Sequence, residues 1–209
     1  MADGTLLLLG AGGHAESCID VIERENRFRV AGLLGLATEV GTSVLGYPVL
    51  DEDRALATWV QDVPNVLVVV GQIRTADVRV RLFEAARRAG ATLPTIVSPL
   101  AHVSRHAHVG EGSIVMHGAV VNAAAQVAEN CIVNSMALIE HGAAVAAHCH
   151  VSTGVRLNSA VHVGEGTFIG SGTVVTQGTR IGARCVIGLG QVITRDVPDD
   201  TKIMVTRSW

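Results

Sequence analysis

The chain has 209 residues and a formal net charge of −3, and 48% of its residues are hydrophobic although only 3% are aromatic. We therefore expect a core of Val, Ala, Leu and Ile. The slightly acidic balance gives no reason to expect a nucleic-acid partner, and no stretch approaches the ~20 apolar residues of a membrane-spanning helix. The first ten residues, MADGTLLLLG, have no basic segment before their short apolar run, so we expect no signal peptide and a cytoplasmic location.

The segment TLLLLGAGGHAESCIDVIE predicts a strand, a glycine turn and a helix. The turn holds Gly10, Gly12 and Gly13, and the helix is expected over about residues 15–25. A glycine turn that leads into a helix suits an anion, because free N–H groups and the helix dipole point at the ligand. A tight connection without any ligand is the alternative, since Ala15 stands at the third glycine position of the dinucleotide-binding fingerprint.

Two further segments complete an α/β domain that we assign to residues 1–96. VPNVLVVVGQ predicts a buried strand, and TADVRVRLFEAARRAG predicts an amphipathic helix with Thr75 as its N-cap and Gly90 at its C-terminal end. The apolar face of this helix is expected to hold Val78, Leu82 and Ala86. The alternation of strands and helices is typical of a Rossmann-type domain.

A repeat of six residues occupies the rest of the chain. Every sixth residue from Val97 to Ile193 is Val, Ile or Leu, and the position four later is nearly always small. A period of six fits neither a helix nor a half-buried strand, and it predicts a parallel β-helix in which three consecutive hexads, with one short strand each, make one coil. We expect Gly or Asn directly after the aliphatic residue to supply the positive φ of the turns. Residues 97–209 would thus form a β-helix domain with a C-terminal tail.

The cysteines follow the same repeat. Cys131, Cys149 and Cys185 are separated by whole numbers of coils, so we expect them in one interior column as packed, free thiols. There is no C-x-x-C pair, so neither a zinc ribbon nor a redox motif is indicated.

Eight of the nine histidines lie between His102 and His162. His117 and His141 are expected in strands and pointing outward, and His148 on the outer surface near a turn. The remaining positions expected at solvated coil corners are His102, His106, His108 and His162. No two histidines have the spacing of five found in the zinc carbonic anhydrases built on a β-helix, and zinc needs three or four converging ligands, so no metal site is expected.

His141 and His150 are separated by half of one coil. They should therefore lie on different sides of the β-helix. They can meet only across an interface between subunits, as in a closed cyclic oligomer.

Four segments together carry a resemblance to a known family: LLGAGGHA, GYPVLDEDRAL, VVVGQIRTADVRVRL and NSMALIEHGAAVAAHCHVSTG. The chain resembles the left-handed β-helix acyltransferases that acetylate nucleotide-linked sugars, such as UDP-4-amino-sugar N-acetyltransferases and sialic-acid O-acetyltransferases. The combination of GAGGHA with N-x6-H-x8-H makes the resemblance specific. It implies a left-handed β-helix, a homotrimer, and acetyl-CoA bound between adjacent β-helices.

The resemblance also implies roles for individual residues. His141 would be the catalytic base and Asn134 a polar catalytic-site residue. The coenzyme would be contacted by His150 of a neighbouring subunit and by Gly154 and Ser159. The residues implied to receive the nucleotide-sugar diphosphate are Gly10, Gly12, Gly13 and His14.

Several positions depart from the family pattern. Gly142 stands where an acidic residue usually orients the base, LNSA replaces LAGG, the acidic residue that often recognises uridine is missing near Gly35, and the chain ends in MVTRSW instead of GVPA. These changes weaken the case for a UDP-linked substrate, and the resemblance favours GDP-perosamine, with a UDP-4-amino sugar next.

The expected function is acetyl-CoA-dependent N-acetylation of the C4 amine of a nucleotide-linked amino sugar in polysaccharide biosynthesis, by direct transfer with a histidine base and without a metal. Two alternatives stay open. One is O-acetylation of a sugar hydroxyl, and the other is a non-catalytic scaffold that binds nucleotide sugars, which Gly142 motivates.

Overall fold

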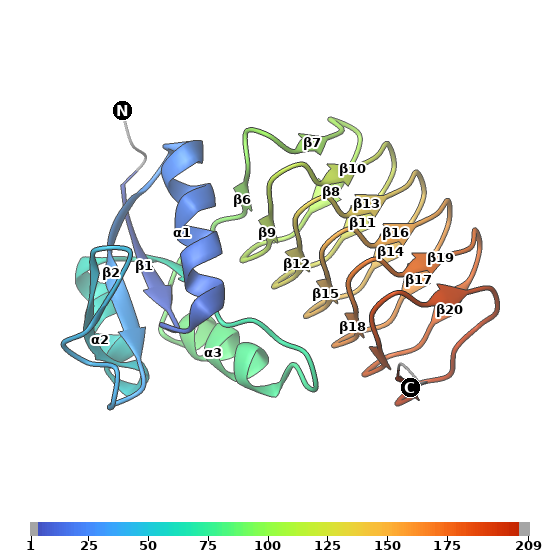
Figure 1. Cartoon of the computed structure of the whole chain (residues 1–209). Helices are drawn as coiled ribbons and strands as arrows, with labels where there is room; N and C mark the ends of the chain where they lie inside the picture. The colour runs from blue at the N-terminus through green and yellow to red at the C-terminus, as the bar shows by residue number, and fades with distance from the viewer. Residues whose placement is uncertain (1–3, 205–209) are drawn as a thin grey trace.

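The computed structural model describes residues 4–204, so that most of the unusual C-terminal segment MVTRSW lies outside the described residues. The N-terminal part begins with β1 (Thr5–Leu9), α1 (Gly13–Glu25) and β2 (Arg29–Gly35). It continues with β3 (Ser43–Val44), β4 (Tyr47–Glu52), the short 3-10 helix η1 (Asp53–Ala55), α2 (Leu56–Asp62), β5 (Asn65–Val68) and α3 (Asp77–Arg88). Figure 1 shows these elements as a separate body at one end of an elongated β-helix.

The N-terminal sheet has the strand order β3-β4-β2-β1-β5, and all its pairs are parallel except β3 with β4. The leucines of β1 are buried on both faces: Leu6 and Leu8 pack with α1, while Leu7 and Leu9 pack with α2 and α3. The chain therefore winds in both directions from β1, as a Rossmann-type sheet does. In such sheets ligands bind outside the carboxyl ends of the strands where the winding direction changes, which here means β1 and β5.

Each of the seventeen hexads forms one two-residue strand that ends on its aliphatic residue. The strands lie in three parallel sheets, and from the strand at Val97 to the strand at Val175 each pairs with the strand three hexads further along the chain. We call the sheets the β6, β7 and β8 faces after their first strands. The β6 face contains β6 (Ile96–Val97), β9 (Ile114–Val115), β12 (Ile132–Val133), β15 (His150–Val151), β18 (Phe168–Ile169), β21 (Val186–Ile187) and β23 (Lys202–Ile203).

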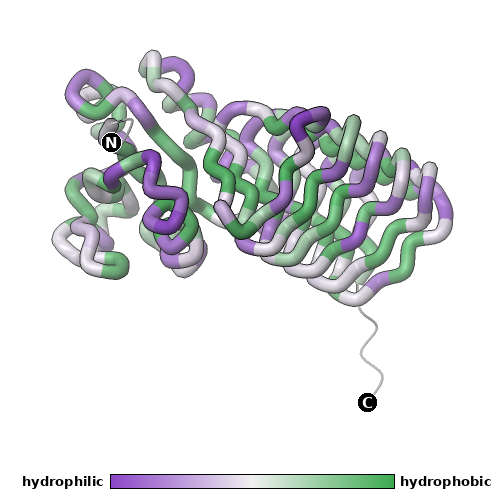
Figure 2. Tube along the Cα trace, turned by 90° about the horizontal axis from the view of Figure 1, so that it is seen from above, coloured by the Kyte–Doolittle hydropathy of each residue, from purple (hydrophilic) through white to green (hydrophobic). Residues whose placement is uncertain are grey.

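The β7 face contains β7 (His102–Val103), β10 (Val120–Val121), β13 (Leu138–Ile139), β16 (Arg156–Leu157), β19 (Val174–Val175) and β22 (Val192–Ile193). The β8 face contains β8 (His108–Val109), β11 (Gln126–Val127), β14 (Ala144–Val145), β17 (His162–Val163) and β20 (Arg180–Ile181). The predicted fold class is confirmed: an α/β Rossmann-like domain is followed by a left-handed parallel β-helix. The aliphatic residues and the three column cysteines form its continuous core, and Figure 2 shows hydrophobic positions recurring from coil to coil.

The prediction for the turns was wrong in one respect. The positive φ falls three residues after the aliphatic position, not one, and it recurs at every sixth residue from Gly112 to Gly190. The glycines directly after the aliphatic position instead allow the backbones of successive coils to approach each other closely. A Cβ on Gly110 or Gly170 would lie 2.6 Å from backbone atoms of the next coil, so a side chain has no room there.

The two parts of the chain meet along the β6 face, whose outward Ile96, Ile114 and Ile132 share a core with α1, and along the corner between the β8 and β6 faces, which we call the junction corner. Its positions of positive φ are Gly112, Asn130, His148, Gly166 and Arg184. Helix α3 packs on this corner. A Cβ on Gly112 would lie 2.5 Å from the Phe83 ring, so the contact requires glycine.

Arg79 on α3 is 1% exposed and crosses this junction. Its guanidinium donates to the carbonyl oxygens of Val68 (2.8 Å) and Val70 (2.9 Å) at the end of β5, and to that of Asn130 (3.1 Å) on the junction corner. Burial lowers the pKa of Arg79 to about 10, so it stays a cation near neutral pH. The prediction that Val78 lies on the buried face was wrong: Val78 is exposed, because Arg79 turns inward to these carbonyls.

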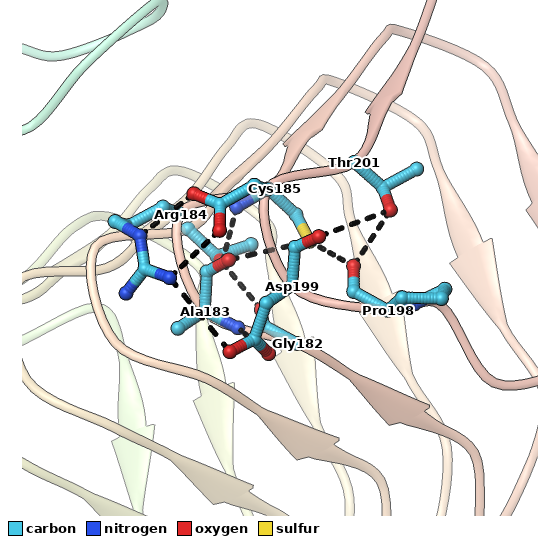
Figure 3. A network of polar contacts seen from close by, with 9 residues as sticks. Gly182, Ala183, Arg184, Cys185, Pro198, Asp199 and Thr201 are labelled. Carbon is cyan, nitrogen blue, oxygen red and sulfur yellow. Dashed lines mark hydrogen bonds and ion pairs between the residues drawn. The ribbon is translucent and has the colours of Figure 1, made fainter.

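The last coil is closed by the loop that returns after β22. Arg184, at the end of the junction corner, forms two bonds to the Asp200 carboxylate at 2.7 and 2.8 Å, and the backbone N–H of Ala183 donates to Asp199 (Figure 3). These contacts satisfy groups that the next coil would otherwise pair. No helix in the described part of the chain is long and apolar enough to cross a membrane.

Candidate functional site

The predicted anion site lies at the carboxyl ends of β1 and β5, where the sheet topology favours a ligand. Gly10 has a φ of +106°, and a Cβ there would collide with the Val70 side chain, so this glycine fixes the turn. Gly12 is the N-cap of α1, and Cβ atoms on Gly12 or Gly13 would meet nothing within 4 Å. The first turn of α1 therefore presents its N–H groups to an open surface that an anion can approach.

His14 lies beneath this turn, in the first turn of α1. Its Nε2 atom is buried and has no hydrogen-bond partner in the described residues. Burial, with a smaller effect of the Arg79 charge, lowers the pKa of His14 to about 3, so the ring is neutral at pH 7. A buried, unpartnered ring nitrogen beside an open glycine turn is available to a ligand.

His150 lies next to His14, with ring centroids 6.2 Å apart. The His150 Nδ1 atom is 2.8 Å from the Gln72 carbonyl oxygen, to which it can only donate. Its Nε2 is 3.1 Å from Nδ2 of Asn134 and accepts there. Burial lowers the pKa of His150 to about 4, which agrees with a neutral ring whose two nitrogens have opposite roles.

His141 lies on the corner between the β7 and β8 faces, in the turn after β13, and its side chain is 68% exposed. Its Nδ1 atom is 3.2 Å from Oε2 of Glu140 and 3.4 Å from Oγ of Ser159. The same carboxylate oxygen accepts the backbone N–H of His141 and a bond from Nδ2 of Asn122, each at 3.1 Å. Since Nδ1 faces the carboxylate, Nε2 is left to exchange a proton with a ligand.

Glu140 supplies an acidic partner that sequence reasoning missed. The His141 backbone N–H, with further bonds from the His141 ring and Asn122, holds the pKa of Glu140 below its ordinary value. Gly142, where an acid was expected, has a φ of +67° in the tight turn. Two sequence signals were present: Glu140 directly precedes His141, and Asn122 stands one full coil before Glu140 in the repeat.

The residues proposed from the sequence therefore fall into two groups. His14, Asn134 and His150 lie together beside the glycine turn, while Ser159 lies with His141. The two groups share no hydrogen-bond partner in the described residues, and β13 and β15 belong to different faces. Gly154 lies on the corner between the β6 and β7 faces, where its N–H donates to the Ser135 carbonyl and the space around its Cα is open.

Three comparisons with known proteins bear on this arrangement. The family model of the PglD N-terminal domain matches residues 5–85. Perosamine N-acetyltransferase from Caulobacter crescentus, solved as a variant with CoA and GDP-perosamine, is 32% identical, with 98% of this chain and 95% of that chain covered and a TM-score of 0.90. The acetyltransferase domain of PglB from Neisseria gonorrhoeae, solved with acetyl coenzyme A, is 30% identical with 96% of both chains covered and a TM-score of 0.88.

The chain belongs to the hexapeptide-repeat acetyltransferase family. WeeI from Acinetobacter baumannii, at 15% identity and a TM-score of 0.74 over 97% of both chains, shares the fold. No protein among those with curated descriptions matches the chain.

The other histidines of this acetyltransferase differ from expectation in three ways. His102, His108 and His162 begin two-residue strands and do not lie at corners, whereas His117 and His141 lie in turns and not in strands. His148 was expected at the surface, but it is 7% exposed. It packs edge-on against Phe83 with centroids 5.7 Å apart, and its carbonyl accepts from Gln72, because the N-terminal domain covers the junction corner.

The described residues of this acetyltransferase contain no group of three or more His, Cys, Asp or Glu side chains that could hold a metal ion. A cavity of about 630 Å³ lies between the start of α3 and the junction corner. The residues at its two sides are charged, with Arg74 and Asp77 facing Glu165 and Arg184.

Proposed function

We propose that this chain is an acetyl-CoA-dependent N-acetyltransferase that acts on the C4 amine of a nucleotide-linked amino sugar. GDP-perosamine is the favoured substrate, and a UDP-4-amino sugar is second. The observation that carries this proposal is the similarity, across both domains, to perosamine N-acetyltransferase bound to CoA and GDP-perosamine. Two solved forms of that relative, each in complex with CoA and GDP-perosamine, replace a histidine by Asn or Ala.

The glycine turn is proposed to bind the diphosphate of the nucleotide sugar. The free N–H groups at the start of α1 favour a negative charge there. His14 would contribute a hydrogen bond from its unpartnered Nε2 and no positive charge, because the low pKa keeps its ring neutral. The neutral His150 and Asn134 would form the polar wall between this turn and the coenzyme.

His141 is proposed as the general base. Glu140 at Nδ1 favours the tautomer with Nδ1–H, so that Nε2 carries the lone pair. The C4 amine attacks the thioester carbonyl carbon, a C–N bond forms, the C–S bond breaks, and the amine proton passes to Nε2. The coenzyme leaves as its thiolate, which then takes up a proton. Holding amine and thioester together removes much of the entropic barrier.

The reaction requires a second copy of the chain, because the two groups of residues lie on different faces. The β7 face supports a homotrimer, since four of the six outward residues on its strands are apolar: Val120, Leu138, Val174 and Val192, with His102 and Arg156 as the exceptions. The β8 face presents mostly polar residues: His108, Gln126, His162 and Arg180, with Ala144 as the exception. Exposed apolar side chains continue onto the corner between the β6 and β7 faces at Leu100, Met136 and Leu189. Exposed apolar patches of this kind mark protein interfaces.

This interface would bring His141 of one copy to the His14–Asn134–His150 group of the next, with acetyl-CoA between the two β-helices. Closed cyclic symmetry then gives every subunit the same contacts. A cytoplasmic location is proposed along with this function.

A substrate panel tests the activity. GDP- and UDP-linked 4-amino sugars are incubated with acetyl-CoA and the protein, and released thiol is followed. The matching 4-hydroxy sugars are the controls. Turnover confined to the amino sugars is expected. Turnover of the hydroxy sugars would identify an O-acetyltransferase, and coenzyme binding without any turnover would favour a scaffold.

A further inference from the structure

A second cavity lies at the carboxyl ends of β2 and β4, on the same edge of the sheet as the glycine turn. Its volume is about 390 Å³, and its walls come from the end of β2, from η1 and α2, and from α3. Neighbouring strands are about 4.8 Å apart, so this cavity lies about 5–10 Å along the edge from β1. Given the proposed function, a nucleotide with its diphosphate at the glycine turn would extend its base in this direction.

Asp53 is the unusual group in this cavity. Its Oδ1 atom is buried and has no hydrogen-bond partner among residues 4–204. Burial raises the pKa of this carboxyl group, and the Arg81 charge opposes the rise. An unpaired buried carboxylate oxygen costs free energy, so such an atom in a cavity indicates a place that a ligand donor fills.

The neighbouring acidic residues already have partners. Glu39 accepts the backbone N–H of Leu36 at 2.7 Å, and Glu52 is 2.7 Å from the guanidinium of Arg54. The position of Glu39 also explains the missing acid after β2. A Cβ on Gly35 would lie 2.6 Å from Oε2 of Glu39, so a longer side chain at Gly35 would displace the Glu39 carboxylate from its present position.

The remaining walls suit a flat aromatic ring. Leu36 is 62% exposed at the mouth, and the small side chains of Ala37, Ala57 and Ala85 line the cavity. Arg81 is exposed on α3 and forms no ion pair or hydrogen bond within the described range. The cavity thus offers an apolar surface for stacking, one unpaired carboxylate oxygen, and one cation.

We propose that Asp53 selects the base of the nucleotide sugar and that this base is guanine. Guanine carries adjacent N1–H and N2–H donors, which a single carboxylate accepts in parallel. Its O6 and N7 acceptors suit an arginine, here Arg81. Uracil has one N–H between two carbonyl oxygens, so a carboxylate that accepts from it also faces an oxygen. The inference rests on the proposed function for its ligand class, and on the cavity for its residue.

Calorimetric titration of the full chain with nucleoside diphosphates tests this. GDP is compared with IDP, which lacks the 2-amino group, and with UDP. The wild type is expected to bind GDP at least ~10-fold more tightly than IDP, since one hydrogen bond to a charged group is lost, and UDP more weakly than GDP. Asp53→Asn should bring GDP and IDP within ~3-fold of each other. It should also gain affinity for XDP, because the amide N–H₂ donates to the xanthine O2 atom.

The control is Glu52→Gln, a neighbouring acid paired with Arg54, which should keep the preference for GDP. An unchanged ratio of GDP to IDP affinity in a folded Asp53→Asn variant overturns the inference, as does tighter binding of UDP than GDP to the wild type. Binding is measured without turnover, so the proposed function is judged separately. Guanine selection without acetyl transfer would support the role of Asp53 and reject the assignment as an enzyme. Acetyl transfer only to UDP-linked sugars would support the assignment as an enzyme and reject the role of Asp53.

Discussion

The Glu140 carboxylate and the Nδ1 atom of His141 lie 3.2 Å apart on an exposed corner of the β-helix. The residue that precedes the histidine thus orients it, not the residue that follows. Because the same carboxylate oxygen also accepts the His141 backbone N–H and a bond from Asn122, its position is fixed independently of the ring. This pair removes the reason to regard the chain as a scaffold that lacks an orienting acid.

Replacing His141 by Ala should lower kcat by ~10²–10⁴, the usual effect of losing a general base. The side chain is largely exposed, so the free energy of unfolding should change by no more than about 0.5 kcal/mol. Thiol release gives the rate, and thermal unfolding with acetyl-CoA titration serves as the control for folding and coenzyme binding. A turnover near that of the wild type would remove His141 from the mechanism.

Replacing Glu140 by Gln should lower kcat by about 10- to 100-fold. This is less than the ~10⁴ lost with a buried orienting carboxylate, because the half-buried Glu140 can be replaced in part by water. KM for the amino sugar should change little, since Glu140 acts through the imidazole. Glu129→Gln, on the junction corner, is the matched control and should keep full turnover. If both variants have the same kcat, Glu140 does not orient the base.

Mixing two inactive variants tests whether one site is built from two subunits. His141→Ala and His150→Ala should each be inactive as homotrimers. After random subunit exchange, about one quarter of the sites should receive both intact residues and regain activity. Activity is measured before and after exchange, and each variant alone is carried through the same procedure as the control. No recovery, with exchange demonstrated by mass spectrometry, would contradict a site shared between subunits.

Gly112→Ala tests the packing of the domain junction. The change strains the backbone, because an alanine would have to adopt a φ of +63°. It also places a Cβ 2.5 Å from the Phe83 ring. Gly90→Ala is the matched control, with a φ of +79° and open space around it. Gly112→Ala should be the more destabilising by about 1–3 kcal/mol, the usual cost of overpacking. Adding Phe83→Leu should recover part of this loss in denaturant titrations, and strict additivity of the two changes would contradict the contact.

The largely buried histidines predict a pH dependence of stability. Their pKa values in the folded chain are about 3 for His14 and about 4 for His150, below the ordinary 6.5. The unfolded chain binds more protons between these values, so stability is fully present above pH 6.5 and falls as the pH is lowered toward 4. The slope should reach about 1.4 kcal/mol per pH unit for each histidine.

The measurement is the unfolding midpoint at fixed protein concentration from pH 4 to 7.5. A variant with Gln at both positions should show a smaller slope than the wild type. The exposed His108→Gln variant is the control and should keep the wild-type slope. An equal slope in all three proteins would show that neither histidine is buried in the neutral form.

Much of the fold was predictable because it depends on local, periodic constraints. The sixth positions point into the interior of the β-helix, where their Val, Ile and Leu side chains pack together with the cysteines. The period of six therefore predicted the coils and the cysteine column. The turn geometry was predicted less well. Glycine serves both positive φ and close backbone approach, and composition does not distinguish the two uses at Gly110 and Gly112.

The site was predictable only in part. Sequence spacing correctly separated His141 from His150, because the two are half a coil apart. It did not reveal that the N-terminal domain covers His148, or that Arg79 turns toward backbone carbonyls while Val78 faces solvent. Those positions depend on contacts between segments that lie far apart in the sequence, for which the local pattern holds no signal.

The sequence by itself determined the repeat, the glycine turn and the family resemblance, because each is a pattern of residue types separated by a few positions along the chain. Only the tertiary structure decided which acid accompanies each site. Glu140 meets Nδ1 of His141 in a tight turn. Among the described residues Oδ1 of Asp53 has no hydrogen-bond partner, whereas the carboxylates of Glu39 and Glu52 accept from Leu36 and Arg54. The partner of a carboxylate is whichever group the folded chain places within hydrogen-bond distance, and this depends on the tertiary structure.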